Sequence, residues 1–179
     1  QANTLVSGEK VWEAGRARDR AFTCAKLFWW YNMYSTADWS VTPRPAYPAD
    51  GRKLPDIYSS PPELRRELLD ALGPFPLFQF WGPGAGLVST RWIADAALHV
   101  FAQRRPTLTL VYLPHLDYAL QRWGPDDPRL AAELAAVDAE AGRVIERARS
   151  DGAEVLVLSE YGIGAVSRPV HLNRILRAA

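Results

Sequence analysis

Polar side chains gather directly after an apolar, β-branched run in the stretch TLTLVYLPHLDYALQRWGPDD, residues 107–127. The run ends at Pro114, and the polar residues that follow it are His115, Asp117, Tyr118, Gln121 and Arg122. In an α/β protein, reactive groups sit just past the carboxyl ends of parallel strands, where side chains leave the sheet and face a crevice. Carboxylate, amide and imidazole groups at such a place are typical of a metal or acid–base site. We therefore expect the functional site at the end of this run.

A second strand-like run, EVLVL at residues 154–158, follows a helical pattern that predicts a long helix over residues 128–150. Together with a strand at 107–113, this order predicts a right-handed βαβ crossover with two parallel strands. The loops after the two strands would then emerge at the same edge of the sheet. Asp117 and Glu160 are therefore expected to face each other, although they lie far apart in the sequence.

The spacing alone leaves more than one interpretation of this pair open. As oxygen donors, Asp117 and Glu160 suit a divalent metal ion, and as two carboxylates at one edge they could instead share acid and base roles. A purely structural interpretation is that they cap helices or pair with Arg122 and Arg168. Further candidate site residues near the two strand ends are His115, Gln121, Tyr161 and His171.

The rest of the chain predicts an α/β fold with a mostly parallel sheet flanked by helices. AFTCAKLFWW, residues 21–30, is an apolar run of strand length that suits a strand buried on both faces. Helical patterns follow at 60–72 and 89–105. Repeated prolines predict a loop insert over residues 31–60, with a short strand at 39–42. The aromatic side chains of this insert either form a stacking platform for a base or sugar or simply cover the body.

Composition excludes several classes of protein. The 179 residues carry a formal net charge of +1 with scattered charges, which argues against nucleic acid or an anionic membrane surface as a partner. The single cysteine, Cys24, excludes an internal disulfide and Cys-rich zinc motifs, and its apolar setting predicts a buried thiol. No apolar run approaches the ~20 residues that span a bilayer. We expect a soluble, cytoplasmic protein.

The ends of the sequence predict a fragment of a longer chain. It opens with Gln1, has its only methionine at Met33, and stops at Ala179 just after a helical pattern begins. We expect residues 1–179 to form a single α/β domain, with parts of any active site outside it.

The order of these motifs resembles a known family. YLPHLDYALQRWGPDD, followed by LAAVDAEAGRVIERARSDG and VLVLSEYG, is similar to the middle of the type I phosphodiesterase/nucleotide pyrophosphatase group of the alkaline phosphatase superfamily. In that group a strand ends in an aspartate, followed four residues later by histidine and then Gly-Pro, and the aspartate and histidine bind one metal. Asp117 matches the aspartate and Gly124-Pro125 the turn, whereas Gln121 stands in place of the histidine. The resemblance implies an alkaline phosphatase-like core fragment.

The second family motif, Ser-Asp-His-Gly, binds the other metal and reads Ser159-Glu160-Tyr161-Gly162 here. The resemblance implies divalent metal ions, zinc in this family, with Asp117 and Glu160 as metal ligands. It implies hydrolysis of small phosphate esters or nucleotides by the full-length protein, through a hydroxyl nucleophile that lies outside this chain, so the isolated fragment is expected to be inactive. The alternative is a catalytically inactive protein of the same fold that binds a nucleotide or another phosphorylated ligand.

Overall fold

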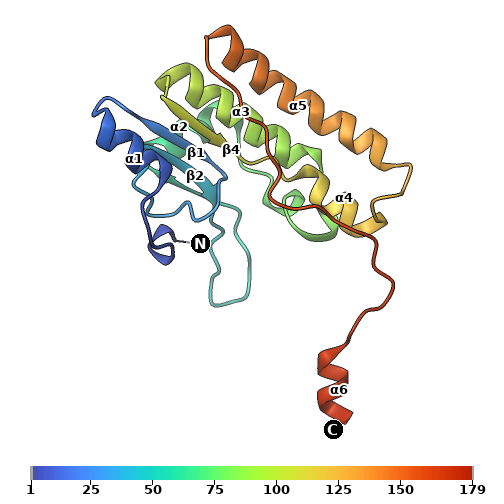
Figure 1. Ribbon diagram of the computed structural model, residues 1–179. Coiled ribbons are helices and arrows are strands. Elements are labelled where there is room, and N and C mark those ends of the chain that lie inside the picture. Colours follow the sequence, from blue (N-terminus) through green and yellow to red (C-terminus); the bar gives the residue numbers. More distant parts are fainter. Residues whose placement is uncertain (1, 179) are drawn as a thin grey trace.

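The computed structural model describes residues 2–178, which form one four-stranded sheet with helices on both of its faces (Figure 1). The strands are β1 (Cys24–Leu27), β2 (Trp39–Pro43), β3 (Ile57–Ser60) and β4 (Leu108–Val111). They lie in the order β3-β2-β1-β4. β1 pairs in parallel with both β2 and β4, and β2 pairs antiparallel with β3. The predicted α/β fold with a mostly parallel sheet is confirmed.

β1 is the central strand, and all four of its residues are buried. Ala25 and Leu27 face the larger core, which also contains residues of α2 (Glu63–Leu72) and α3 (Leu87–Arg104). Burial on both faces is what the apolar run predicted, although the strand is shorter than residues 21–30. Because parallel neighbours occupy both edges of β1, the carboxyl ends of β1, β2 and β4 lie at the same edge of the sheet.

The other face of β1 is covered by α1 (Val11–Arg18) and carries a buried lysine. Lys26 is fully buried; its Nζ lies 4.2 Å from the centroid of the Trp12 ring and 3.3 Å from Ser35 Oγ. Burial penalises the charged amine and lowers the pKa of Lys26 to about 8. Cys24 lies on the same face, and burial raises the pKa of its thiol to about 12. The predicted buried thiol is confirmed.

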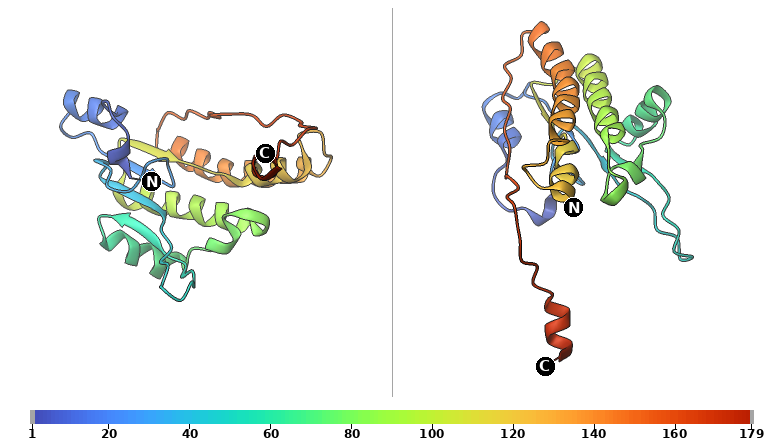
Figure 2. Two further views of the ribbon diagram at one scale, coloured as in Figure 1. Left: turned by 90° about the horizontal axis from the view of Figure 1, so that it is seen from below. Right: turned by 90° about the vertical axis from the view of Figure 1, so that its right-hand side faces the viewer.

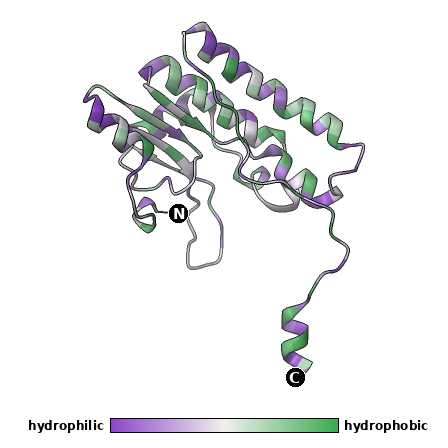
Figure 3. Ribbon diagram, in the orientation of Figure 1, coloured by the Kyte–Doolittle hydropathy of each residue, from purple (hydrophilic) through white to green (hydrophobic). Residues whose placement is uncertain are grey.

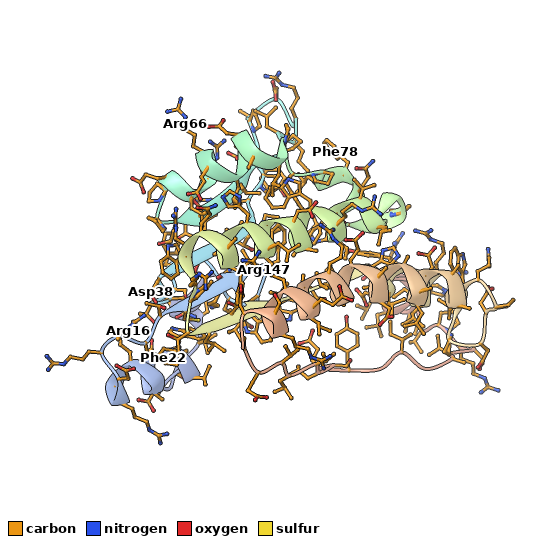
Figure 4. The ribbon with its side chains drawn as sticks, turned by 90° about the horizontal axis from the view of Figure 1, so that it is seen from above. Arg16, Phe22, Asp38, Arg66, Phe78 and Arg147 are labelled. Atoms are coloured by element: carbon orange, nitrogen blue, oxygen red, sulfur yellow. The ribbon has the colours of Figure 1, made fainter. Side chains whose placement is uncertain are left out.

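The helices on the larger core form one layer in which α3 lies between α2 and α5 (Leu130–Ser150), as Figure 4 shows. A charged cluster joins α3 to α5. The buried Glu140 carboxylate accepts hydrogen bonds from Arg91 Nε at 2.7 Å and from Arg143 Nη1 at 2.6 Å. Burial opposes ionisation of Glu140, but these two bonds outweigh it and lower its pKa. α4 (His115–Trp123) packs against α5 beyond this cluster.

Residues 31–60 are not only a loop insert, because they contain both β2 and β3. The strand predicted at 39–42 is confirmed as β2, whereas β3 was not predicted. In β3, burial alternates from residue to residue, as in a strand with one buried face. A bridge between Ala46 and Leu54 extends the hairpin beyond the two strands. The prolines lie at the end of β2 and in the connection to β3, where they do not prevent the two strands from pairing.

Short 3₁₀ turns complete the body, which we define as residues 2–150. They are Asn3–Leu5, Leu77–Gln79 and Gly82–Gly84. No helix within residues 2–178 is both long enough and apolar enough to cross a membrane.

The chain after α5 contradicts the predicted second strand. Residues 154–158 form no strand and pair with no part of β4, and Leu156, Val157 and Leu158 are 83%, 74% and 62% exposed. A strand forms only where a neighbouring strand pairs with it, and no strand of residues 2–178 pairs with this segment. The βαβ crossover is therefore wrong, and β4 ends the sheet.

The segment runs back along α4 and ends in α6 (Leu172–Ala178), which projects away from the body (Figure 1 and the right-hand view of Figure 2). We call residues 153–178 the arm. Hydrophobic and hydrophilic residues alternate along α6 in Figure 3, and all of its residues are exposed, so no other element within residues 2–178 covers it.

Candidate functional site

A strained loop at the carboxyl end of β1 places an indole at the edge of the sheet. Phe28, Tyr31 and Tyr34 have φ angles of 58°, 49° and 58°, a region that non-glycine residues rarely adopt. The buried Asn32 stabilises this loop, because its Nδ2 donates to one backbone carbonyl of β1 at 3.0 Å and to one of β2 at 2.6 Å. Strained backbone held by buried hydrogen bonds is frequent at functional sites. Here it presents Trp30, which is 40% exposed.

The start of α4 places Asp117 at the same edge. Gly124 ends α4 with a φ of 80°, and Asp117 lies in the first helical turn, where a carboxylate is favoured by the helix dipole. Tyr161, from the arm, donates its Oη proton to Asp117 Oδ1 at 2.8 Å. Ser159 Oγ donates to the Tyr161 carbonyl at 2.7 Å and so closes the turn that carries Glu160.

Glu160 completes a cluster around the aromatic side chains at the strand ends. Trp30 Nε1 donates to Glu160 Oε1 at 3.0 Å, and the Trp30 ring lies 5.7 Å from that of Tyr112, which follows β4. The structure therefore places both Asp117 and Glu160 near the Tyr112 side chain at the strand ends. It does so without the predicted crossover, because the arm returns to the sheet edge as a loop. We call Trp30, Tyr112, Asp117, Glu160 and Tyr161 the carboxylate cluster.

Burial and the two carboxylates raise the pKa values of the Tyr112 and Tyr161 phenols. The hydrogen bond to Asp117 and, second, burial raise the pKa of Tyr161 well above its ordinary value. Burial, followed by the negative charge of Asp117, raises the pKa of Tyr112, and Glu160 acts in the same direction. Both phenols are therefore hydrogen-bond donors at neutral pH rather than anionic ligands.

The other predicted site residues lie elsewhere. His115 is two residues before Asp117, about 200° away around α4, and its Nε2 lies 2.5 Å from Glu133 Oε2 on α5. Gln121 is exposed in the last turns of α4. His171 is exposed just before α6, which Figures 1 and 2 place away from α4. The sequence grouped these three side chains with the carboxylates because they are close in sequence to the strand ends, but the helix and the arm separate them.

The donor atoms do not fit a histidine-containing pair of zinc ions. Within residues 2–178, no three His, Cys, Asp or Glu side chains are grouped as a metal site. Asp117 and Glu160 offer only oxygen atoms, and each already accepts a hydrogen bond from a side chain of the cluster. Zinc prefers nitrogen and sulfur ligands, whereas two carboxylates suit a single hard cation such as Mg²⁺ or Mn²⁺.

Sequence reasoning missed Tyr112 as a site residue and treated Trp30 only as part of the aromatic insert. Both follow the last apolar residues of parallel strands, at the position where that reasoning looked for chemistry. Applying the same rule to every parallel strand would have found them.

A family comparison supports the resemblance in the motifs. The model of the family described as "Type I phosphodiesterase / nucleotide pyrophosphatase" matches residues 1–179, the whole of the chain. Comparison with curated proteins and with solved structures gave no significant match. The α/β sheet and the two motifs at its carboxyl edge agree with the family match. The chain therefore belongs to the type I phosphodiesterase/nucleotide pyrophosphatase family.

Proposed function

We propose that this protein hydrolyses phosphate esters and that the carboxylate cluster is its substrate site. The observation that carries the proposal is the Tyr161–Asp117 hydrogen bond, which joins the two family motifs at the carboxyl edge of the sheet. A neutral, packed surface would not need two carboxylates at this edge. The family's activity on phosphate esters agrees with such a site.

In the proposed site, Asp117 and Glu160 hold one divalent cation, of the Mg²⁺ or Mn²⁺ type rather than zinc. When bound, such an ion neutralises charge on the phosphate oxygens. The protein's own groups orient the carboxylates: Trp30 Nε1 fixes Glu160, and Tyr161 Oη fixes Asp117. Because each carboxylate has a second oxygen, it can accept one of these bonds and still bind a cation.

Aromatic rings border the carboxylates and favour a substrate with a planar group. The Trp30 and Tyr112 rings are tilted by 50° to each other, and Trp30 keeps 40% of its surface exposed. An exposed indole can stack on a nucleobase or another aromatic leaving group. We therefore propose nucleotide-like or aryl phosphodiesters as substrates.

The test compares Asp117→Asn and Glu160→Gln with Asp138→Asn, which removes the same charge from an exposed position on α5. Hydrolysis of an aryl phosphodiester is measured with the full-length protein, which supplies the nucleophile that these 179 residues lack, in the presence of Mg²⁺, Mn²⁺ or Zn²⁺, and metal binding is measured by calorimetry. We expect each site variant to weaken metal binding at least about tenfold, as loss of a charged ligand does. Hydrolysis should fall more steeply, while Asp138→Asn keeps both properties. Unchanged metal binding and turnover in the two site variants would refute the proposal.

A second candidate function is binding without catalysis. It is favoured by the fact that both carboxylates already accept hydrogen bonds from side-chain donors. In this case a nucleoside monophosphate binds in EDTA with no turnover under any metal, and Trp30→Ala weakens that binding. Stoichiometric metal in the purified protein would exclude this alternative.

A further inference from the structure

The last part of the arm, residues 161–178, is both apolar and basic. Its large exposed aliphatic side chains are 57–95% exposed, and they are Val166, Val170, Leu172, Ile175 and Leu176. The same segment contains three arginines and no aspartate or glutamate. The scattered charge of the whole chain predicts no anionic partner, but the charge of this segment has a single sign. An anionic surface therefore complements it.

The helix α6 separates the apolar and the basic side chains onto opposite faces. Successive residues of an α-helix are rotated by about 100°, so Leu172, Ile175 and Leu176 lie within one face. Arg174 and Arg177 lie on the opposite side of the helix. A basic face opposite an apolar face is typical of helices that lie in the interface of a lipid bilayer.

The position of α6 leaves its apolar face free. α6 projects away from the body in Figure 1 and in the right-hand view of Figure 2, and all of its residues are exposed. A helix of seven residues is marginal in water unless packing supports it. A surface that buries the apolar face would therefore stabilise α6.

A second copy of the chain offers a competing apolar surface, the groove between α4 and α5 that is lined by Leu116, Leu120, Leu130 and Leu134. Docking in that groove would bury the apolar face of α6 but leave the arginines of the opposite face in water. An anionic bilayer contacts both faces, because apolar side chains enter the acyl boundary while guanidinium groups reach the charged headgroups. The charge of the segment therefore favours lipid over a second copy.

We propose that residues 166–178 bind the surface of bilayers that contain anionic phospholipids, with α6 lying in the plane of the interface. Leu172, Ile175 and Leu176 enter the boundary of the acyl chains, and the arginines lie among the headgroups. The segment follows Tyr161, whose hydrogen bond to Asp117 joins the arm to the body. Lipid binding would thus hold the carboxylate cluster near the membrane, but it does not depend on the proposed hydrolysis.

The test is co-sedimentation of the purified full-length protein with vesicles of phosphatidylcholine in which about a third of the lipid is phosphatidylserine. Vesicles of phosphatidylcholine alone are the control for lipid charge. We expect saturable binding to the anionic vesicles that weakens as the salt concentration rises. Binding to the neutral vesicles should be at least about tenfold weaker, because the arginines gain nothing there.

A first pair of variants tests the charge. Arg174→Gln combined with Arg177→Gln should weaken binding to the anionic vesicles at least about tenfold, because each arginine near such a surface contributes about fivefold. Arg18→Gln combined with Arg20→Gln removes the same charge from exposed positions in the body and should leave binding unchanged.

A second pair of variants tests the apolar face and excludes unfolding as the cause of lost binding. Leu176→Asn should weaken binding at least about tenfold, because a leucine no longer enters the bilayer. Leu5→Asn is the control, since Leu5 is 75% and Leu176 74% exposed. Neither substitution removes a packed side chain, so both variants should keep the Tm of the wild type.

Several results would overturn the proposal. They are absence of saturable binding to the anionic vesicles, equal binding to neutral vesicles, and full binding by Leu176→Asn or by the variant that lacks Arg174 and Arg177. A dimer in light scattering that Leu176→Asn converts to a monomer would also overturn it, because a second copy would then cover the apolar face.

Discussion

The body and the arm contain similar residues but are held in different ways. In the body, leucine, valine and phenylalanine side chains pack into a core between the sheet and the helices. In the arm, every residue is exposed apart from the partly buried Val155 and Ile163. Two side-chain hydrogen bonds, from Trp30 to Glu160 and from Tyr161 to Asp117, join the arm to the body.

This difference has a consequence for the carboxylate cluster, because one of its carboxylates belongs to each region. Asp117 is fixed by a helix that packs on α5, whereas Glu160 is positioned by hydrogen bonds at the surface. Net hydrogen-bond contributions are about 1 kcal/mol each, far less than a packed core supplies. The separation of the two carboxylates is therefore easier to change than the fold that carries them.

The largest expected effect is a core truncation in the body. Leu68 on α2 is fully buried, so Leu68→Ala should lower the free energy of unfolding by about 2–5 kcal/mol through lost burial and a cavity. Leu156 in the arm is 83% exposed, and Leu156→Ala should change that free energy by less than about 0.5 kcal/mol. Urea denaturation measures both. A large loss of unfolding free energy in Leu156→Ala would mean that the arm is packed in solution. The body and the arm would then not differ in the way proposed here.

The next largest effect should be a gain in stability when the buried amine of Lys26 is replaced. The pKa of Lys26 falls from 10.5 to about 8, so the folded protein binds this proton less tightly than the unfolded chain does. The free-energy cost of burying the charged Lys26 amine is fully present below pH 8 and disappears as the pH rises towards 10.5. Lys26→Met should therefore raise the free energy of unfolding at pH 7 by about 3 kcal/mol, from a shift of about 2.5 pKa units at about 1.4 kcal/mol for each unit.

The control for this prediction is the exposed Lys53, since Lys53→Met should have little effect. The raised pKa of Cys24 opposes the trend above pH 9, but that thiol is present in all three proteins. Urea denaturation at pH 7 and pH 10 should show a gain for Lys26→Met that shrinks at the higher pH. A gain of equal size at both values would contradict the assignment to the charge of Lys26.

A smaller loss of unfolding free energy is expected when the charged cluster between α3 and α5 is disrupted. Glu140→Gln keeps the shape of the side chain but removes the charge that faces Arg91 and Arg143. The Arg91 and Arg143 side chains are 55% and 45% exposed, so we expect a loss of about 1–2 kcal/mol, between the values for surface and buried pairs. Glu146→Gln, at an exposed position on α5, is the control.

The same carboxylate predicts a pH dependence. The pKa of Glu140 is lowered in the folded protein, so its stabilising contribution is complete above its ordinary value of 4.5 and is lost as the pH falls through the lowered value. The difference in unfolding free energy between the wild type and Glu140→Gln should therefore shrink in acid. A difference that stays constant from pH 7 to pH 3 would contradict this role.

The smallest effect on global stability should come from the contact between arm and body. Tyr161→Phe removes the hydrogen bond to Asp117 and should change the free energy of unfolding by less than about 0.5 kcal/mol, because the arm adds little to the core. It should nevertheless speed limited proteolysis within residues 153–178. Tyr47→Phe, at a tyrosine that is 67% exposed, is the control. If the two variants are cleaved at the same rate, the hydrogen bond does not hold the arm.

The sequence predicted most of the sheet because burial on both faces leaves a clear pattern. The apolar runs that became β1 and β4 have buried or partly buried side chains on both faces of the sheet. The run EVLVL has the same apolar pattern but forms no strand. A sequence pattern shows that a segment prefers the strand conformation, but it does not show whether a neighbouring strand is available to pair with it. β3 was missed because its alternation is short and lies among prolines.

The motifs identified the two carboxylates of the site but not the side chains that hold them. The motifs drew attention to Asp117 and Glu160, which both lie at the strand ends, but the predicted βαβ path between them was wrong. His115 was assigned to the wrong side of α4, because closeness in sequence was used where helical rotation decides. The partners that fix each carboxylate, Trp30 and Tyr161, depend on the strained loop and on the arm, which no local pattern specifies.

The pairing of β4 with β1 also sets an order of events during synthesis. Thr23 and Thr107, which adjoin the amino-terminal ends of these strands, are separated by 84 positions, whereas β2 follows β1 after a short loop. Contacts that close long loops form late, and chains fold progressively as they leave the ribosome. We expect β1, β2 and β3 to associate first, while one side of β1 stays open for as long as α2 and α3 are being made. A nascent chain stalled before β4 would therefore present this open edge to chaperones, and its release should coincide with the emergence of Leu108–Val111 from the exit tunnel.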